Sequence, residues 1–154
     1  MKSPSIVIVK KSTPQARKEI NHLLSQLSLT QTPPKPLTAA QFASVLAQKN
    51  VFFLAARASK GADEKIIGFL VIYLIQLPSG LGATAEDLIV DKPYRKWGIG
   101  RVLIEHGISL AEKKHARHVS LRTNPKRIQA NKLYPQVGMR LIAGNFYRIH
   151  LPRM

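Results

Sequence analysis

A strand, a glycine-containing turn and a helix are encoded one after another in residues 83–106, which read ATAEDLIVDKPYRKWGIGRVLIEH. The apolar run that ends at Val90 is typical of a strand, and Gly98 and Gly100 interrupt the pattern. The apolar residues that follow predict an amphipathic helix to about His115. Its apolar face consists of Ile99, Val102, Leu103, His106, Leu110 and Ala111. A strand that turns into a helix in this way presents free backbone N–H groups, which can bind an anion.

The turn matches neither of two common phosphate-binding motifs. It lacks the Gly-Lys-Ser/Thr end of the Walker A motif, and Leu103 stands where the dinucleotide fingerprint needs its third glycine. Arg95, Lys96 and Arg101 add positive charge around the turn. The turn itself therefore leaves two interpretations open, a binding site for a pyrophosphate or a tight connection without a ligand.

The segments on either side extend this unit into an α/β domain with a mixed sheet, which we expect to span residues 1–154 without a linker. Short β-branched runs and turn residues predict strands at 5–10, 51–57, 66–75, 83–90 and 118–122. Proline, caps and apolar periodicity predict further helices at 14–28, 39–48 and 126–134. One or two closing strands are expected within 139–151, around Gly144 and Asn145.

The charge of the chain is strongly positive. It has 24 Lys and Arg against 8 Asp and Glu, a formal net charge of +16, and 14 of the basic residues lie in 88–154. This predicts an anionic partner, which can be a nucleic acid, a membrane surface or a phosphate-bearing ligand. The chain has no Cys, and its longest apolar stretch, 66–75, is shorter than the roughly 20 residues of a membrane span. We expect a soluble, cytoplasmic protein without a membrane partner.

Two motifs resemble the GNAT superfamily of N-acetyltransferases. Residues 95–100, RKWGIG, are similar to its Gln/Arg-x-x-Gly-x-Gly/Ala signature. Residues 127–134, RIQANKLY, followed by Gly138 and Met139, resemble its Ala-x-x-Leu-Tyr…Gly-Phe element. The resemblance covers 83–148 in detail and implies a single-domain GNAT-like fold. In that fold a bulge splays the central strand from the next parallel strand and opens a slot for acetyl-coenzyme A or another acyl-coenzyme A.

The resemblance also implies which residues bind the cofactor. The pyrophosphate would bind the backbone amides of residues 95–100, and the pantetheine arm would run along the strand that ends near Val90. Lys96 stands where the family often has glycine. Lys126 and Arg127 would contact phosphates or form a solvated basic face. The implied cofactor-binding residues are Ile89, Val90, Arg95, Lys96, Trp97, Gly98, Ile99, Gly100 and Arg101. Asn131 shares the helix face of Tyr134 and can either bind the cofactor arm or only cap or solvate its helix.

Two side chains are candidates for the chemistry. The resemblance implies that Tyr134 is the acid beside the thioester sulfur, and a packing tyrosine is the alternative. Glu86 is the candidate base. Asp87 follows it on a strand, so we expect the two to point to opposite faces, with only one in the acceptor pocket; either acid can instead pair with a basic neighbour. Pro135 predicts an early end of the last helix, which would alter the aim of Tyr134.

These observations predict an N-acetyltransferase that transfers an acetyl group from acetyl-coenzyme A directly to a primary amine in a ternary complex, as a monomer or homodimer. The acceptor can be a small molecule or a protein amine, and no metal is expected. The positive field favours neutral or carboxylate-bearing amines over polyamines. Two alternatives remain, a nucleic-acid or ribosome-associated binding module and a non-catalytic acyl-coenzyme A sensor. Nucleic acid is not favoured because the chain has no such motif and only 6% aromatic residues.

Overall fold

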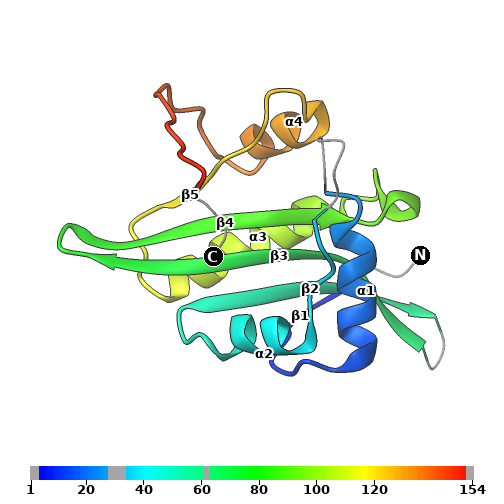
Figure 1. The fold of residues 1–154 in the computed structure, drawn as a ribbon. Helices are drawn as coiled ribbons and strands as arrows, with labels where there is room; N and C mark the ends of the chain where they lie inside the picture. The colour runs from blue at the N-terminus through cyan, green and yellow to red at the C-terminus, as the bar shows by residue number, and fades with distance from the viewer. Residues whose placement is uncertain (1–3, 28–33, 61–62, 152–154) are drawn as a thin grey trace.

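The computed structural model describes residues 4–27, 34–60 and 63–151. In this part of the chain five strands form one sheet in the order β1-β2-β3-β4-β5 (Figure 1). The strands β1 to β4 pair antiparallel, whereas β5 is parallel to β4. The mixed sheet predicted from the sequence is therefore confirmed. The bounds of the strands are Ser5–Ile8 for β1, Val51–Lys60 for β2, Asp63–Leu77 for β3, Gly80–Val90 for β4 and Val119–Leu121 for β5.

Helices cover both faces of this sheet. Helices α1 (Pro14–Leu24) and α2 (Ala39–Ala47) lie on one face and α3 (Ile99–Lys113) on the other, while α4 (Ile128–Gln136) lies beside the β4–β5 edge (Figure 1). A short 3₁₀ helix, η1 (Lys92–Tyr94), connects β4 to the turn before α3. The starts of α1 and α2 agree with the sequence, because Thr13 and Thr38 cap them with their side chains. Position 28 of the predicted first helix lies outside the described residues.

The core consists of two apolar layers, one on each face of the sheet. The layer under α1 and α2 includes a row of aromatic rings, in which Phe53 lies 4.8 Å from Phe69 and 5.5 Å from Phe42 between ring centroids. On the other face, Gly107 lets α3 approach closely, since a Cβ there would lie 2.9 Å from side-chain atoms of β3. His106, predicted for the buried face of α3, is exposed; its place is taken by Ile104 and Gly107.

The hairpins are longer than the sequence predicts. Strands β2 and β3 pair as far as Lys60 and Asp63, so the polar segment expected as a turn is mostly strand, and its residues 61–62 lie outside the described residues. Strand β4 starts at Gly80, directly after a two-residue turn. In both hairpins the backbone hydrogen bonds continue to the tip, through polar residues in β2–β3 and through Gly80, Leu81 and Gly82 in β4.

The closing strands expected within 139–151 do not form in the described structure. The apolar alternation of this segment is typical of a strand, but a strand also needs a neighbour with which to pair. Strand β5 has only three residues, and the segment after α4 stays irregular beside it. Its apolar side chains are exposed, for example Leu141 at 97% and Ile149 at 82%.

Candidate functional site

A β-bulge in β4 determines the geometry of the candidate site. Phe69 of β3 pairs with Ile89, but Val71 pairs with Glu86, so two residues of β4 face one residue of β3. Asp87 is the extra residue at this bulge, and its backbone has a left-handed conformation with φ of 54°. The bulge also switches the faces of the strand: Ala83 and Ala85 belong to the core under α3, whereas Ile89 packs in the core under α1 and α2.

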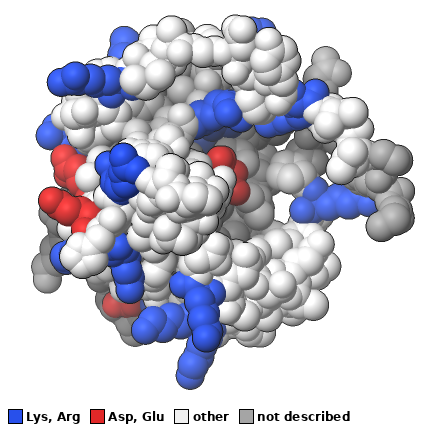
Figure 2. Space-filling model, turned by 90° about the vertical axis from the view of Figure 1, so that its left-hand side faces the viewer, with Lys and Arg blue, Asp and Glu red and all other residues white. Residues whose placement is uncertain are grey.

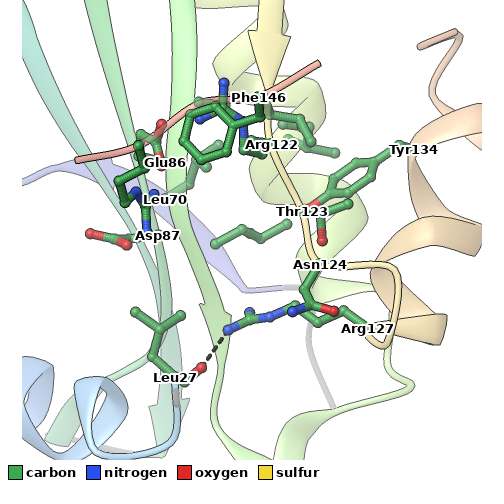
Figure 3. A pocket seen from close by; sticks show the side chains of 15 residues that line it. Leu27, Leu70, Glu86, Asp87, Arg122, Thr123, Asn124, Arg127, Tyr134 and Phe146 are labelled. Carbon is green, nitrogen blue, oxygen red and sulfur yellow. Dashed lines mark hydrogen bonds between the residues drawn. The ribbon is translucent and has the colours of Figure 1, made fainter. Parts of the chain in front are cut away.

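The parallel pairing of β4 with β5 ends just before the bulge. Its last pair is Ala85 with Leu121, and the described residues provide no strand on that side of β4 from Glu86 to Val90. The strands separate there, as the resemblance implied, and a cavity of about 550 Å³ opens between them (Figure 3). The cavity is lined by Leu27, Leu70, Ala85, Glu86, Asp87, Leu88, Ile104, Leu121, Arg122, Thr123, Asn124, Arg127, Tyr134, Phe146 and Arg148.

Both acidic residues of β4 reach this cavity (Figure 3). The expectation that Glu86 and Asp87 point to opposite faces is wrong, because the left-handed conformation of Asp87 breaks the alternation on which it was based. Burial raises the pKa of the Glu86 carboxyl, the charge of Asp87 raises it further, and Arg122 and Arg148 oppose the shift. Burial likewise raises the pKa of Asp87, against the charge of Arg127. The half-buried Glu86 carboxylate is thereby a stronger base than an exposed one.

Tyr134 of α4 lines the same cavity as Glu86 (Figure 3). Burial raises the pKa of its phenol, while the charge of Arg127 and the hydroxyl of Thr123 act in the opposite direction. Pro135 does not end α4 before this residue, since the helix continues to Gln136 and closes with Gly138 in the left-handed conformation. The expected early helix end is thus wrong: proline at the penultimate helical position removes only one hydrogen bond of the last turn.

Asn131 is held by the chain itself. Its amide nitrogen donates to the carbonyl oxygens of Asn124, at 3.0 Å, and Arg127, at 2.9 Å. These bonds fix the turn between β5 and α4, and they use the donor that was expected to reach the cofactor. Arg127 has a similar role, because its guanidinium donates to the carbonyl of Leu27 and so connects the start of α4 with the end of the segment after α1 (Figure 3).

The glycine turn follows β4 and η1 and leads into α3. Gly98 is the N-cap of α3 with φ of 77°, and a Cβ there would meet no atom within 4 Å. A Cβ on Gly100 would lie in van der Waals contact with Leu133, at 3.5 Å, and Val90, at 3.7 Å, so only the backbone at Gly98 is open. Lys96 also has a positive φ, of 67°, which explains why glycine suits this position of the motif. The N–H groups at the start of α3 lack intrahelical partners and so can bind an anion.

The side chains of the turn differ in what they can offer a ligand. Ile99 is buried at 1% exposure and contributes only its backbone, whereas Trp97 is 58% exposed. Arg95 folds back, with Nε donating to the carbonyl of Val90 at 2.9 Å. Arg101 pairs with Glu105 one helical turn further on. None of residues 89–101 lines the 550 Å³ cavity. The cavity meets β4 at residues 85–88, before the turn, and Tyr134 reaches it from α4.

Asp91, which the sequence analysis did not single out, anchors this turn to α1. Its carboxylate is buried and accepts a hydrogen bond from Gln26 at 2.7 Å, while His22 and Lys65 lie at 3.2 and 3.4 Å. Gln26 in turn accepts the backbone N–H of Lys92 at 3.1 Å. Burial alone would raise the pKa of Asp91, but the hydrogen bonds from Gln26, His22 and Lys65 outweigh it and hold the pKa below its ordinary value.

The sequence did not predict several other residues that line the cavity. Arg122, Thr123 and Asn124 directly follow β5, and their position was a usable signal, because polar residues at the carboxyl end of a parallel strand often form a site. Phe146 and Arg148 gave no signal, since their approach to the cavity depends on the path of the irregular segment after α4. In the described part of the chain no three His, Asp or Glu side chains form a group that could hold a metal ion.

Comparisons with known proteins agree with this geometry. The model of the acetyltransferase (GNAT) family matches residues 18–139, so the chain belongs to this family, whose members use acetyl-coenzyme A. No curated protein sequence matches the chain. No helix of the described residues is long and apolar enough to cross a membrane.

Solved structures show the same fold. A ribosomal-protein-alanine N-acetyltransferase from Brucella melitensis is 20% identical, with a TM-score of 0.79 and coverage of 98% of this chain and 99% of that one. A protein described as a transcriptional regulator from Bacillus halodurans is 23% identical, with a TM-score of 0.77 and coverage of 96% and 99%. AAC(6')-Iy, in complex with a bisubstrate analogue containing coenzyme A, is 19% identical, with a TM-score of 0.73 and coverage of 96% and 99%. At these identities the similarity concerns the fold.

The buried Asp91 should contribute to stability in a pH-dependent way. We expect Asp91→Asn to lower the free energy of unfolding at pH 7 by about 1.5–3 kcal/mol, the usual range for hydrogen bonds to a charged group. Because the folded pKa lies below the ordinary value of 3.8, this contribution is present above that pH and is lost as the pH falls through the folded pKa. Urea unfolding at pH 7 and pH 3 measures it. Glu64→Gln, at a side chain that is 51% exposed, is the control. If Asp91→Asn lowers the free energy of unfolding by the same amount at both pH values, the expectation is contradicted.

Proposed function

We propose that this protein is an N-acetyltransferase that transfers the acetyl group of acetyl-coenzyme A to a primary amine by direct attack in a ternary complex. One observation supports it most: a carboxyl group and a phenol, Glu86 and Tyr134, line the same cavity at the point where β4 and β5 separate. The pKa of each is raised by burial. Base and acid therefore have one space in common, which is large enough for a thioester and a small amine.

The proposed cofactor site combines the turn with the open edge of β4. The backbone N–H groups between Arg95 and Arg101, at the start of α3, would bind the pyrophosphate. The pantetheine arm would follow the edge of β4 past Val90 and Ile89, where no strand pairs with it in the described structure. The acyl-coenzyme A supplies the acetyl group as a thioester.

The chain's own residues supply the proton transfers. An ammonium ion has no free electron pair, so the acceptor must lose a proton before its nitrogen can attack. Glu86, or Asp87 beside it, would accept this proton, and the raised pKa of either carboxyl makes it a better base. Tyr134 would donate its proton to the sulfur as the carbon–sulfur bond breaks. The nitrogen would lose its second proton as the amide forms, and this proton would return to the tyrosinate, directly or through water. A phenol suits this role because it keeps its proton at neutral pH, all the more when burial raises its pKa.

The two alternatives differ from this proposal in what they predict. A non-catalytic sensor would bind acetyl-coenzyme A without turnover, and the position of Tyr134 inside the cavity argues against it. A nucleic-acid or ribosome-associated module would need no acyl-coenzyme A. Acetylation of a protein amine remains compatible with the proposal, and one structural neighbour is described as a ribosomal-protein-alanine N-acetyltransferase. Thiol release from acetyl-coenzyme A in the presence of amines separates the proposal from both alternatives.

The proposed binding of the cofactor phosphates at the glycine turn can be tested at Gly100. We expect Gly100→Val to weaken binding of acetyl-coenzyme A at least tenfold, or about 1.4 kcal/mol. A Cβ itself fits there, but the two further methyl groups must crowd Leu133, Val90 or the space of the ligand. Calorimetric titration measures the affinity, and Gly144→Val, at a glycine with no atom within 4 Å of an added Cβ, is the matched control. Unchanged affinity in a folded Gly100→Val variant would refute this position of the phosphates.

The role of Tyr134 can be tested by removing only its hydroxyl. Tyr134→Phe should lower kcat roughly 10²-fold, the usual effect of losing a general acid, with little change in the affinity for acetyl-coenzyme A. Tyr73→Phe, at a tyrosine of β3 that does not line the cavity, should leave kcat unchanged. Steady-state kinetics with any accepted amine would decide. Normal turnover of Tyr134→Phe would make this residue a packing tyrosine.

A further inference from the structure

We propose that the acceptor is a small zwitterionic amine, such as a free amino acid, whose carboxylate is bound by Arg122 and Arg148 while its amine faces Glu86 and Asp87. This inference depends on the proposed acetyltransferase function and specifies the acceptor for the same cavity. Each of its steps concerns residues that line that cavity.

Two guanidinium groups meet at one aromatic ring. The central carbon of Arg122 lies 3.3 Å from the centroid of the Phe146 ring, and that of Arg148 lies 5.1 Å from it. Stacking on an aromatic face holds a planar guanidinium in a fixed orientation and leaves its N–H groups free to donate. Arg122 directly follows β5, whereas Arg148 belongs to the irregular segment after α4, so two separate parts of the chain converge here. Figure 3 shows Arg122 beside Phe146.

These two cations have no anionic partner within 4.0 Å among the described residues. Glu86 is near enough for both to act on its pKa, yet it forms no ion pair with either. Bringing two like charges to one ring has an electrostatic cost that a carboxylate between them would offset. Arginine is well suited to that task, since its forked donors match the two oxygens of a carboxylate.

The cavity therefore has two poles of opposite charge. Glu86 and Asp87 form the acidic pole, and Arg122 and Arg148 form the basic pole. The third arginine of the lining, Arg127, already donates to the carbonyl of Leu27. Figure 2 shows one face of the molecule, with a hollow that has acidic side chains at its wall and basic side chains around it; the residues of the two poles are those that line the cavity. A compact molecule with an amine and a carboxylate complements both poles at once.

The cofactor phosphates do not account for the basic pole. The proposed phosphate site lies at the glycine turn, beyond the end of β4 at Val90. Glu86, which is close to the two arginines, pairs with Val71 of β3, whereas Val90 pairs with Gly68. These partners are three residues apart, so Glu86 lies roughly 10 Å before the end of β4. A polycationic acceptor fits poorly as well, because three arginines and two acids leave the lining with excess positive charge within a chain of net charge +16.

The experiment compares amines that differ only in charge. Amino acids, their amides and spermidine are each offered with acetyl-coenzyme A, and thiol release is measured. At least one amino acid should have a kcat/KM ten or more times that of its amide. Arg122→Gln and Arg148→Gln should each bring the ratio of the two kcat/KM values close to one. Each should raise KM for the amino acid and leave KM for the amide unchanged. Arg140→Gln removes the same charge from the same C-terminal region outside the cavity lining, and it should preserve the ratio.

The possible results separate this inference from the function on which it depends. If amides or spermidine are the better acceptors, or if neither arginine variant changes the ratio, the proposal of a zwitterionic acceptor is wrong. The proposed acetyltransferase function is then still supported. If no small amine of this panel releases thiol, the zwitterion inference fails; peptides with free α-amino and lysine groups then test the proposed function, which fails if they release no thiol either. Circular dichroism and thermal melting establish that each variant is folded. Both arginines are exposed at the cavity, so their replacement should leave the core intact.

Discussion

The single extra residue of β4 at Asp87 is the constraint on which the site depends. Without it, Glu86 and Asp87 would face opposite sides of the sheet, and β4 could continue to pair with β5. With it, the two carboxyl groups line one cavity, Ile89 moves to the other core layer, and the strand beyond the bulge lacks a neighbour on one side. Gly68 of β3 fits against this part of β4, since a Cβ there would lie 2.9 Å from the carbonyl oxygen of Ile89. A local irregularity of the backbone thus produces both the space and the chemistry.

Much of this arrangement can be predicted from the sequence. The β-branched run before Asp91 and the glycines after it identify the strand, the turn and the start of α3. The bulge itself is not visible in the residue pattern, because Glu86 and Asp87 fit an uninterrupted strand equally well. The pair of Arg122 and Arg148 could not be predicted either, since the 25 residues between them include the irregular chain after α4. Local propensity predicts elements, but contacts that depend on a loop path require the structure.

The positions of the charged side chains indicate more about ligand binding than the net charge does. The net charge of +16 is distributed over the whole chain and by itself is compatible with several kinds of anion. In the structure some of the basic groups already have partners: Arg57 and Arg101 pair with glutamates, Lys65 with Asp91, and Arg127 with a backbone carbonyl. Arg122 and Arg148, which have no such partner in the described structure, converge beside the two acids of β4. The contrast between paired and converging cations distinguishes a recognition site from a basic surface.

A crystal structure of the complex with acetyl-coenzyme A tests the central claim most directly, that the gap between β4 and β5 is the acyl-coenzyme A slot. Our account predicts the pyrophosphate on the backbone N–H groups at the start of α3 and the pantetheine arm along β4 between Val90 and Glu86. The thioester should lie within reach of Tyr134 and Glu86. Density for the cofactor outside this gap, or a β4 that pairs with β5 beyond Ala85 and Leu121 in the complex, would contradict it.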